Sequence, residues 1–531
     1  MAQVSFRGNL QTLTFPMLST LSGPTVIDSR GDQTYVKGVS TDGSVPLDLG
    51  VPQAFYCHNI MPSIYGYQTI NYTNVFAAPA SAAVFSDLAL VYATRGTIEP
   101  TPTGFRSYVA IGKEISSGDN FLYVVDVDFF NWRKITAGQP ASIPDGTILT
   151  TANVNGVTYI FLSGIGAFFY DDTIDTLLPR TLDGLDIAEI LGISSSNGYM
   201  FAWTASSVAW SSVVDVEDFV PSDVSGAGGG SLQEAEGRIV VVRPTNLGFI
   251  IYTEGNAVSA TYSGNQDFPW VFKGILGSGG VSSAKMVTLD QVAGSHYAYT
   301  TSGIQQISHV KTTTVLPNIT DFLGGNVFED YDTATDLFTE TEFTGVFRKQ
   351  VSLISDRYLI ISYGVPGGST FTHALVIDLV QSRVGKLKQS HVFCFDRVDL
   401  TEDVVDLSRK SIALLGLDGV CKFIDFDLDN PTPQDTVLIL GKFALAHTNL
   451  AELQEVVLEN IRTGTVFSCD SYTSLDGKNL GTAAPGFLLT QSENQRHYLF
   501  DNGPGVNFSL RLKGTFNLIA FVMRLTAGGR V

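Results

Sequence analysis

Short apolar runs separated by polar turns repeat along most of the chain, beginning at about Val84. Asn-Gly and Asp-Gly dipeptides between such runs favour the two-residue turns of β-hairpins, because their residues tolerate positive φ angles. The pattern therefore predicts a succession of hairpins. Three of the predicted turns are Asn155-Gly156, Asn197-Gly198 and Asp418-Gly419. The runs themselves occupy Asn120–Ile135, Thr151–Asp172, Ser196–Ser212, Thr245–Gly264, Gly294–Ser308, Ser355–Leu387 and Arg409–Asp427.

The spacing of these hairpins indicates a repeated unit. They recur about every 40–50 residues, which is the length of a four-stranded propeller blade. At that spacing about six or seven units fit between residues 83 and 430, and a helix is hard to place in this region except near the start of Asn326–Phe343. We therefore predict an all-β protein whose main body, residues 83–430, is a β-propeller of about six blades.

The segments on either side of the repeat have a different texture. Residues 1–82 are rich in Pro, Gly, Asn and Ser and predict an extended N-terminal arm. Within it, we expect the aromatic stretch Val51–Ile70 to lie against another domain or subunit. After a Pro-bearing linker, the alternation in Tyr498–Val531 predicts a compact C-terminal β-sandwich or barrel over residues 431–531.

Two stretches interrupt the repeat. Ser222–Gly237 is Gly-rich and predicts a flexible loop, but it lacks the pattern of a phosphate-binding loop. Asn326–Phe343 is an acidic insertion that contains aromatic residues, and a short helix is compatible with its start.

The charge balance restricts the classes of partner. A net charge of −20 argues against a protein that grips nucleic acid by its phosphates. The same negative charge is compatible with the wall of a channel through which DNA slides, because like charges repel. It is equally compatible with a role in solubility alone. The region after Asp501 has basic side chains and no carboxylate side chain. In so acidic a chain, this cationic region is a candidate contact for a neighbouring subunit or for DNA. The alternative is an ordinary basic surface. The basic residues of this region include Arg511, Lys513, Arg524 and Arg530.

The cysteines lie far apart and form no CxxC motif, which favours buried free thiols in a reducing compartment. They are Cys57, Cys394, Cys421 and Cys469. The N-terminal residues show no signal-peptide pattern, and no apolar run approaches the ~18–20 residues of a membrane span.

No motif indicates catalysis, a cofactor or a metal. The histidines show neither HExxH nor HxH spacing, there is no GxSxG motif, and nothing points to a Ser-His-Asp triad. Asp425, Asp427 and Asp429 begin like a calcium loop, but Asn430 and Thr436 stand where glycine and glutamate are needed. We therefore predict a non-enzyme with no catalytic, cofactor-binding or metal-binding residues. The histidines are His58, His296, His309, His373, His391, His447 and His497.

The stretch VAWSSVVDVEDF, Val208–Phe219, combines tryptophan, serines and carboxylates in a way that also suits an active site. The interpretation as scaffold is favoured, with Trp210 anchoring a blade core. Serine and aspartate side chains close turns by hydrogen bonds to nearby backbone amides. We expect this of Ser211, Ser212, Asp215 and Asp218, with Phe219 and Pro221 fixing the exit into the Gly-rich loop.

Four features together resemble the tail nozzle, or tail hub, proteins of short-tailed bacteriophages. The first is HNIMPSIYGYQTI (His58–Ile70), and the second is VAWSSVVDVEDFVPSDVSGAGGG, similar to a W-S-x-x-x-D-x-x-D-F-x-P element. The third is GRIVVVRPTNLGFIIYTEGNAVSATYSG, and the fourth is the closing β domain. The insertion at 326–343 has no counterpart in that family.

The resemblance implies a structural virion protein, made in the host bacterial cytoplasm. Copies of the chain, six by the family pattern, would form a ring beneath the portal and adaptor, in contact with tail fibre or spike proteins. Its channel would retain double-stranded DNA and conduct it during ejection, without sequence-specific binding. The Gly-rich loop and the acidic insertion are its candidate gate elements.

Two alternatives from other classes stay open. A propeller that recognises a host glycan or receptor needs clustered exposed aromatics, for which Trp132, Trp203, Trp210 and Trp270 are the candidates, although all four fit a core equally well. A polysaccharide-degrading tail enzyme needs two carboxylates about 5–10 Å apart.

Overall fold

The structure is a computed structural model, and it describes the blade strands, most of their connections and the strands of the terminal regions. The described residues are 10–16, 25–27, 33–35, 38–39, 46–47, 54–62, 67–76, 83–93, 105–126, 131–171, 174–265, 268–288, 294–315, 349–354, 357–364, 370–380, 383–396, 412–417, 420–425, 436–444, 449–459, 467–475, 482–491, 495–501, 503–505, 507–518 and 520–530. In these ranges the regular elements are strands and one 3₁₀ turn, η1 (Ala284–Met286).

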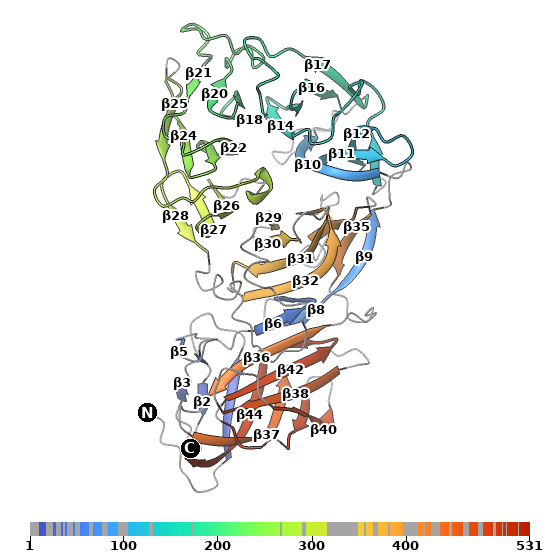
Figure 1. Ribbon diagram of the computed structural model, residues 1–531, viewed down its shortest axis with the longest axis vertical. Coiled ribbons are helices and arrows are strands. Elements are labelled where there is room, and N and C mark those ends of the chain that lie inside the picture. The colour runs from blue at the N-terminus through green and yellow to red at the C-terminus, as the bar shows by residue number, and fades with distance from the viewer. Residues whose placement is uncertain are drawn as a thin grey trace.

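Seven sheets stand around a common axis and form a β-propeller (Figure 1). Each of the first four blades is a four-stranded antiparallel meander. Blade 1 is β10 (Ala83–Ala93), β11 (Phe105–Glu114), β12 (Asn120–Asp126) and β13 (Asn131–Lys134). Blade 2 is β14 (Leu149–Val154), β15 (Val157–Leu162), β16 (Gly166–Asp171) and β17 (Thr176–Arg180). Blade 3 is β18 (Gly192–Ser196), β19 (Tyr199–Trp203), β20 (Ser207–Trp210) and β21 (Gly228–Ser231). Blade 4 is β22 (Ile239–Thr245), β23 (Gly248–Thr253), β24 (Ala257–Tyr262) and β25 (Trp270–Gly274).

The remaining three blades are less regular. In the described residues blade 5 has three strands, β26 (Ser295–Thr300), β27 (Gly303–Ser308) and β28 (Thr312–Thr314). Blade 6 is β29 (Lys349–Ile354), β30 (Tyr358–Tyr363), β31 (Phe371–Asp378) and β32 (Arg383–His391). Blade 7 is β33 (Phe393–Asp396), β34 (Ile412–Leu415) and β35 (Cys421–Asp425), and its outer strand is β9 (Asn71–Phe76), from far upstream.

The predicted all-β propeller is confirmed, with seven blade sheets in the described chain rather than about six. The difference has a topological reason. Blade 7 borrows β9, which lies before the repeat begins, so spacing within 83–430 alone does not reveal a complete last blade. The two Asn-Gly turns are also confirmed: Asn155 and Asn197 have φ angles of 52° and 53°, and the glycines that follow are positive as well. Asp418-Gly419 lies outside the described residues.

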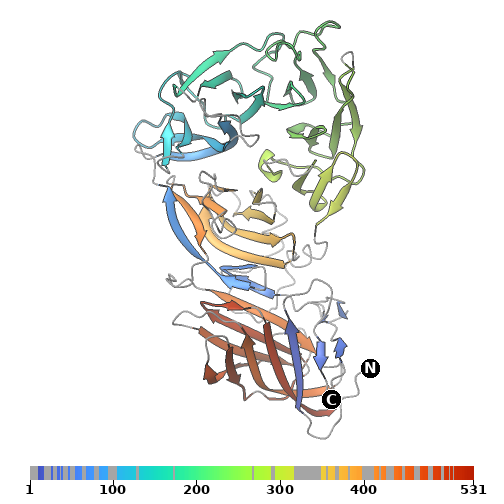
Figure 2. The ribbon, with the colours of Figure 1, turned by 180° about the vertical axis from the view of Figure 1, so that it is seen from behind.

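A β-sandwich lies beyond the propeller, and both ends of the chain contribute to it (Figure 2). Between its sheets, Leu440, Leu458, Tyr498 and Leu510 belong to one buried cluster. The seven-stranded sheet has the order β3 (Gln33–Tyr35), β2 (Thr25–Ile27), β1 (Leu10–Pro16), β44 (Ala520–Arg530), β37 (Asn449–Glu459), β41 (Gln495–Leu499), β40 (Phe487–Gln491). The five-stranded sheet has the order β39 (Thr482–Pro485), β38 (Phe467–Ser474), β42 (Asn507–Gly514), β36 (Val437–Ala444), β6 (Ala54–His58).

Residues 54–76 connect the sandwich to the propeller through shared sheets. β6 pairs with β36 of the sandwich, whereas β7 (Ile60–Pro62) pairs with β32 of blade 6. β8 (Tyr67–Thr69) pairs with β7 and with β43 (Asn517–Leu518), which follows the sandwich strand β42. Thr69 fixes this junction, because its backbone N–H and its hydroxyl both bond to Phe516. These pairings confirm the prediction that Val51–Ile70 lies against another domain. Residues 1–82 are also less irregular than expected, because they contain β4 (Gly38–Val39), β5 (Pro46–Leu47) and the other strands named above.

The prediction of a flexible loop at Ser222–Gly237 is wrong for Gly228–Ser231. Gly228–Ser231 forms β21, the outer strand of blade 3, paired with β20. Small residues are needed there because a Cβ on Gly228 would meet the Trp210 ring at 3.0 Å, and one on Gly229 would meet the Val208 carbonyl oxygen at 2.7 Å. The acidic insertion 326–343 and its expected short helix lie outside the described residues.

Candidate functional site

The loop that joins β20 to β21, residues 211–227 and hereafter the blade-3 loop, contains the serines and carboxylates that resembled an active site. Ser212 is 1% exposed, and its hydroxyl oxygen accepts hydrogen bonds from the backbone N–H groups of Val214 (3.1 Å) and Asp215 (3.4 Å). Asp215 accepts from the N–H of Glu217 at 3.0 Å, and Asp218 accepts from that of Val220 at 2.9 Å. The predicted turn-closing role of these three side chains is confirmed.

Ser211 has a different role from the one predicted. Its hydroxyl accepts from the backbone N–H of Met200 at 3.0 Å and donates to the carbonyl of Ser212 at 3.0 Å. Met200 lies in β19, so Ser211 extends the pairing of the blade beyond the end of β20. Both hydroxyls are buried and are bonded to backbone groups of blade 3 and its loop.

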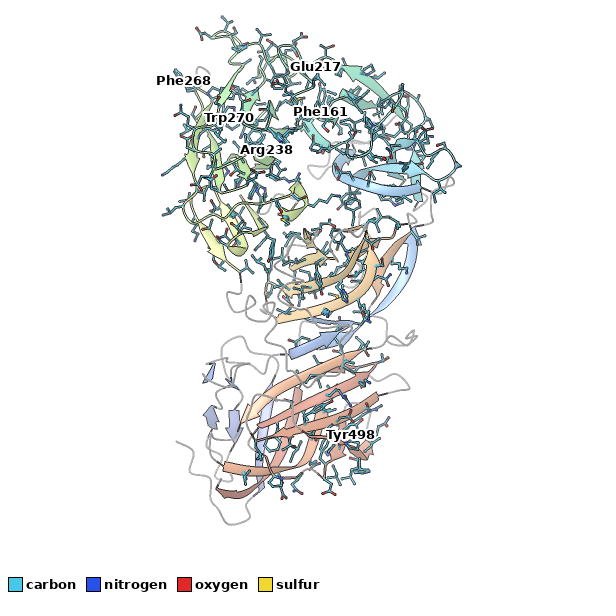
Figure 3. The ribbon with its side chains drawn as sticks, in the orientation of Figure 1. Phe161, Glu217, Arg238, Phe268, Trp270 and Tyr498 are labelled. Carbon is cyan, nitrogen blue, oxygen red and sulfur yellow. The ribbon has the colours of Figure 1, made fainter. Side chains whose placement is uncertain are left out.

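The blade-3 loop also fastens blade 3 to blade 2. The backbone of Asp183 bonds to Glu217 and Phe219 at 2.8 and 2.9 Å, and the Phe219 ring is 2% exposed in the core between the blades. The Glu217 carboxylate, whose residue is labelled in Figure 3, accepts from the Tyr159 hydroxyl at 3.1 Å and lies 3.7 Å from Arg180. Burial, followed by the negative charge of Glu217, raises the pKa of Tyr159 to about 12. This carboxylate therefore serves as an interblade contact.

Trp210 lies at the edge of the core rather than in its centre. It is half-buried, stacks on Phe201 at 6.4 Å and donates its indole N–H to the Gly226 carbonyl at 3.0 Å. The indole thus holds the two ends of the blade-3 loop together. The other tryptophans, Trp132, Trp203 and Trp270, are 2%, 2% and 6% exposed. These four residues therefore do not form the exposed aromatic cluster that a glycan-binding surface would need.

A serine and a histidine do meet inside the propeller, between blades 4 and 5. The Ser259 hydroxyl lies 2.6 Å from Nδ1 of His309, and the Thr245 hydroxyl lies 2.5 Å from Nε2. Thr245 donates to the Gly248 carbonyl, so it accepts from Nε2–H, and Nδ1 accepts from Ser259. A catalytic triad needs a carboxylate on the second nitrogen. Among the described contacts His309 has hydroxyl partners instead, and Ser259 is 2% exposed. This cluster joins two blades.

Two further histidines are buried as neutral rings. His296 donates from Nε2 to the Pro244 carbonyl and accepts from the Tyr252 hydroxyl at Nδ1, which again links blades 4 and 5. His391 donates from Nδ1 to the Gln389 carbonyl and accepts from Ser362 at Nε2. Burial is the main cause that lowers the pKa of His296 to about 3 and that of His391 to about 4. Rings held neutral at physiological pH in this way are structural hydrogen-bonding groups.

The centre of the propeller is crossed by η1, which precedes blade 5. Its Lys285 donates to the Ser86 carbonyl of β10 at 3.1 Å and lies 4.3 Å above the Phe393 ring of blade 7. The Ala284 carbonyl accepts from Arg243 of blade 4 at 3.2 Å, and η1 also contacts β29 of blade 6. Because these partners belong to blades 1, 4, 6 and 7, the turn spans the axis. Within the described residues, η1 therefore lies on the path that a duplex through a single propeller would take.

Little space is left for a small ligand near the blade-3 loop. A cavity of about 100 Å³ lies between the outer part of blade 3 and the segment that precedes it, where Asp186, Glu189, Thr204 and Ser207 are among its lining residues. Ligand sites usually enclose about 300–1,000 Å³. In the described part of the chain, His, Cys, Asp and Glu side chains form no group of three that could hold a metal ion. Of the calcium-like run, Asp425 and Thr436 are described: Asp425 ends β35, and the buried Thr436 hydroxyl donates to the Gly514 carbonyl.

The cysteines and the basic C-terminal residues lie away from the blade-3 loop. Cys394 and Cys469 are buried free thiols, as expected, while the side chains of Cys57 and Cys421 lie outside the described ones. Among the basic C-terminal residues, Arg511 is neutralised by Asp470, with its Nε at 2.9 Å from the carboxylate, so it is not a free cationic contact. Lys513 is exposed on β42, and the side chains of Arg524 and Arg530 are not described. No described helix is long and apolar enough to cross a membrane.

The solved structures compared below are distant neighbours of this chain. No family model and no curated protein matches the sequence. The extracellular domain of a putative one-component system from B. thetaiotaomicron has 10% identity and a TM-score of 0.40, over 94% of this chain and 65% of that one. YCF48 from Cyanidioschyzon merolae has 12% identity and a TM-score of 0.37, over 68% and 99%. The WD40 β-propeller domain of Doa1 has 8% identity and a TM-score of 0.38, over 68% and 98%.

Proposed function

We propose that this chain is a tail nozzle protein of a short-tailed bacteriophage. Six copies form a ring beneath the portal and adaptor, and the ring holds the packaged double-stranded DNA and conducts it during ejection. The protein is made in the host bacterial cytoplasm, resides in the virion tail and contacts fibre or spike proteins there. The proposal rests first on the resemblance of four sequence segments to that family.

The observation that carries the proposal is the junction between the two bodies. Residues 54–76 place successive strands in the sandwich, in blade 6 and in blade 7, and Thr69 is bonded to Phe516 across the junction. Continuous sheets transmit force without a hinge, because bending them breaks several backbone hydrogen bonds at once. Such a stiff unit suits a protein that withstands the pressure of packaged DNA and serves as the attachment point of outer tail proteins.

The path for DNA lies between copies in this proposal, because η1 occupies the axis of each propeller. A net charge of −20 disfavours phosphate binding along that path and keeps the duplex mobile. The blade-3 loop contains the W-S-x-x-x-D-x-x-D-F-x-P-like element on which the resemblance partly rests. Its serines and carboxylates bond to backbone groups and to blade 2, which supports a non-enzymatic role for this element.

The test is the mass and shape of the purified chain. A ring of about six copies with a central opening, seen by mass photometry and negative-stain images, supports the nozzle. A monomer or trimer at every concentration contradicts it. Incubation with capsular polysaccharide and an assay for reducing ends addresses the enzymatic alternative, and a glycan array addresses the receptor-binding one.

A further inference from the structure

The strand β40 is an apolar edge that the described part of the chain leaves exposed. It ends the seven-stranded sheet, and in the described chain it has a partner strand, β41, on one side only. All five of its residues are exposed, including Phe487 (64%), Leu488 (47%) and Leu489 (58%). Leu499 of β41, which is directly opposite Phe487, is 39% exposed as well. Natural proteins usually protect such edges with charges or cover them.

The exposure follows from where the sandwich core stops. Tyr498, next to Leu499, points into the core between the two sheets and is 3% exposed (Figure 3). Phe487 and Leu499 therefore lie on the outer face. Leu488 is directly opposite Tyr498 and therefore lies on the same, inner face of the sheet. It is nevertheless 47% exposed, which indicates that the five-stranded sheet does not fully cover the inner face of β40. Leu489 sits at a bulge, with no residue directly opposite it.

The size of this patch fits a contact with another protein chain. If a large apolar side chain exposes about 200 Å² when free, the four exposed fractions amount to roughly 400 Å² of apolar surface. A stable protein–protein interface buries about 800 Å² on each partner. The β40 side chains thus supply about half of one partner's share, and the flanking backbone of β39 and β40 is available for the rest.

The chemistry of β40 also fits the centre of an interface. Its sequence, FLLTQ, has no charged residue in a chain whose net charge is −20. Interface centres are depleted in charged residues and enriched in aromatic ones. An unpaired strand edge additionally offers backbone donors and acceptors to a neighbouring strand or loop.

We propose that β40 is the surface by which one copy of this chain docks onto the next copy in the ring, an inference that rests on the proposed function. A closed ring needs two different surfaces on each copy. The seven-stranded sheet has its edges, β40 and β3, on opposite sides of the sandwich (Figure 1). The receiving surface is the side that ends in β3. Because neighbouring strands alternate in direction, β40 and β3 run the same way, and a pair across the contact is parallel.

The experiment compares the full-length chain with Leu489→Lys. A buried lysine without a partner opposes docking, while in the free chain the residue is exposed and the substitution leaves the fold intact. We expect the concentration for half-assembly, measured by sedimentation velocity, to rise at least ten-fold. Leu276→Lys, at a leucine that is 90% exposed after β25 on the propeller, is the matched control and assembles normally. Equal thermal unfolding midpoints show that both variants fold.

Three outcomes separate this inference from the proposed function. If the wild-type chain forms a ring and only Leu489→Lys dissociates, both stand. If the wild type and Leu489→Lys form rings equally well, the assignment of β40 is wrong and the nozzle proposal survives. If the wild-type chain is monomeric at all concentrations, and its β40 amides exchange hydrogen as fast as an open strand, the ring and its contact are both wrong.

Discussion

The ammonium nitrogen of Lys285 lies 3.7 Å from the carboxylate of Asp87, on the opposite side of the propeller. Both side chains are largely buried, with exposures of 24% and 19%. Asp87 also accepts from the backbone N–H groups of Leu88 and Leu149, both at 3.0 Å, so a single carboxylate joins blades 1, 2 and 5.

Lys285→Met is expected to lower the free energy of unfolding by about 1–2 kcal/mol. This loss lies between the loss on breaking an exposed ion pair and the loss on breaking a fully buried one. Asp87→Ala should cost more, because it also leaves two backbone donors without an acceptor. Urea unfolding followed by tryptophan fluorescence measures both. The exposed pair of Lys113 and Asp145 is the control, and Lys113→Met should cause no measurable change. Equal losses in the two pairs would contradict the bracing role of η1.

Ser212→Ala is expected to destabilise the propeller by about 1 kcal/mol, because two partly buried backbone N–H groups lose an acceptor that is itself only 1% exposed. Ser222→Ala is the matched control. Ser222 accepts from Val224 and Ser225 in the same loop but closer to solvent, where water replaces the hydroxyl, so its loss should be smaller. Thermal unfolding and ring assembly are the measurements. A Ser212→Ala chain with unchanged stability would show that the blade-3 loop is not a structural device.

The buried histidines predict a dependence of stability on pH. The pKa values of His296 and His391 are lowered to about 3 and about 4, from an ordinary value near 6.5. Below pH 6.5 the unfolded chain binds protons at these rings and the folded chain does not. Their contribution to stability is therefore complete above about pH 6.5 and declines as the pH falls, by about 1.4 kcal/mol per pH unit for each histidine. Denaturant titrations at intervals from pH 7.5 to 5 measure the slope.

His391→Gln is the variant that isolates one of these rings. Glutamine does not titrate, so the slope between pH 6 and 5 should decrease by about one proton. His497→Gln is the control, because His497 is partly exposed and paired with Glu455 at 2.8 Å. An identical slope in wild type and His391→Gln would show that His391 is protonated in the folded state.

Asp378→Ala is expected to destabilise the chain by about 3–5 kcal/mol, because it leaves Arg357 charged and without its main partner. Asp378 is 0% exposed and accepts from Arg357 through Nε at 3.1 Å and Nη2 at 2.5 Å. Replacing both residues by Leu and Met should recover part of the loss, since a buried pair contributes less than its breakage costs. Equilibrium unfolding of the two variants checks this. A double variant as unstable as Asp378→Ala would contradict the argument.

Local sequence patterns predicted the elements whose geometry is set locally. Asn155-Gly156 and Asn197-Gly198 specify their turns because asparagine and glycine accept positive φ, whatever the rest of the chain does. Ser212, Asp215 and Asp218 act within a few residues of themselves, so their role was also accessible from sequence.

Long-range pairing was not accessible in the same way. Nothing in NYTNVF, the sequence of β9, specifies that its partner is Asp425 and its neighbours in β35. The Gly-rich stretch was misjudged because glycine in a strand is ordinarily unfavourable, and it is explained by the Trp210 ring near Gly228 and the Val208 carbonyl near Gly229, which the sequence does not show. Similarly, Lys285 has no local signal for a partner on β10, and Ser259 none for His309.

The closure of the ring by β9 constrains the order in which this protein folds. Residues 71–76 leave the ribosome first but find their partner strand only after residues 421–425 are made. β1 waits longer still, for β44 at the other end of the chain. Until then blade 7 has an open edge, and both early strands expose apolar residues that can pair wrongly. The late, long-range pairings make folding slow, so the ring proposed here would assemble only from chains whose last strand is already in place.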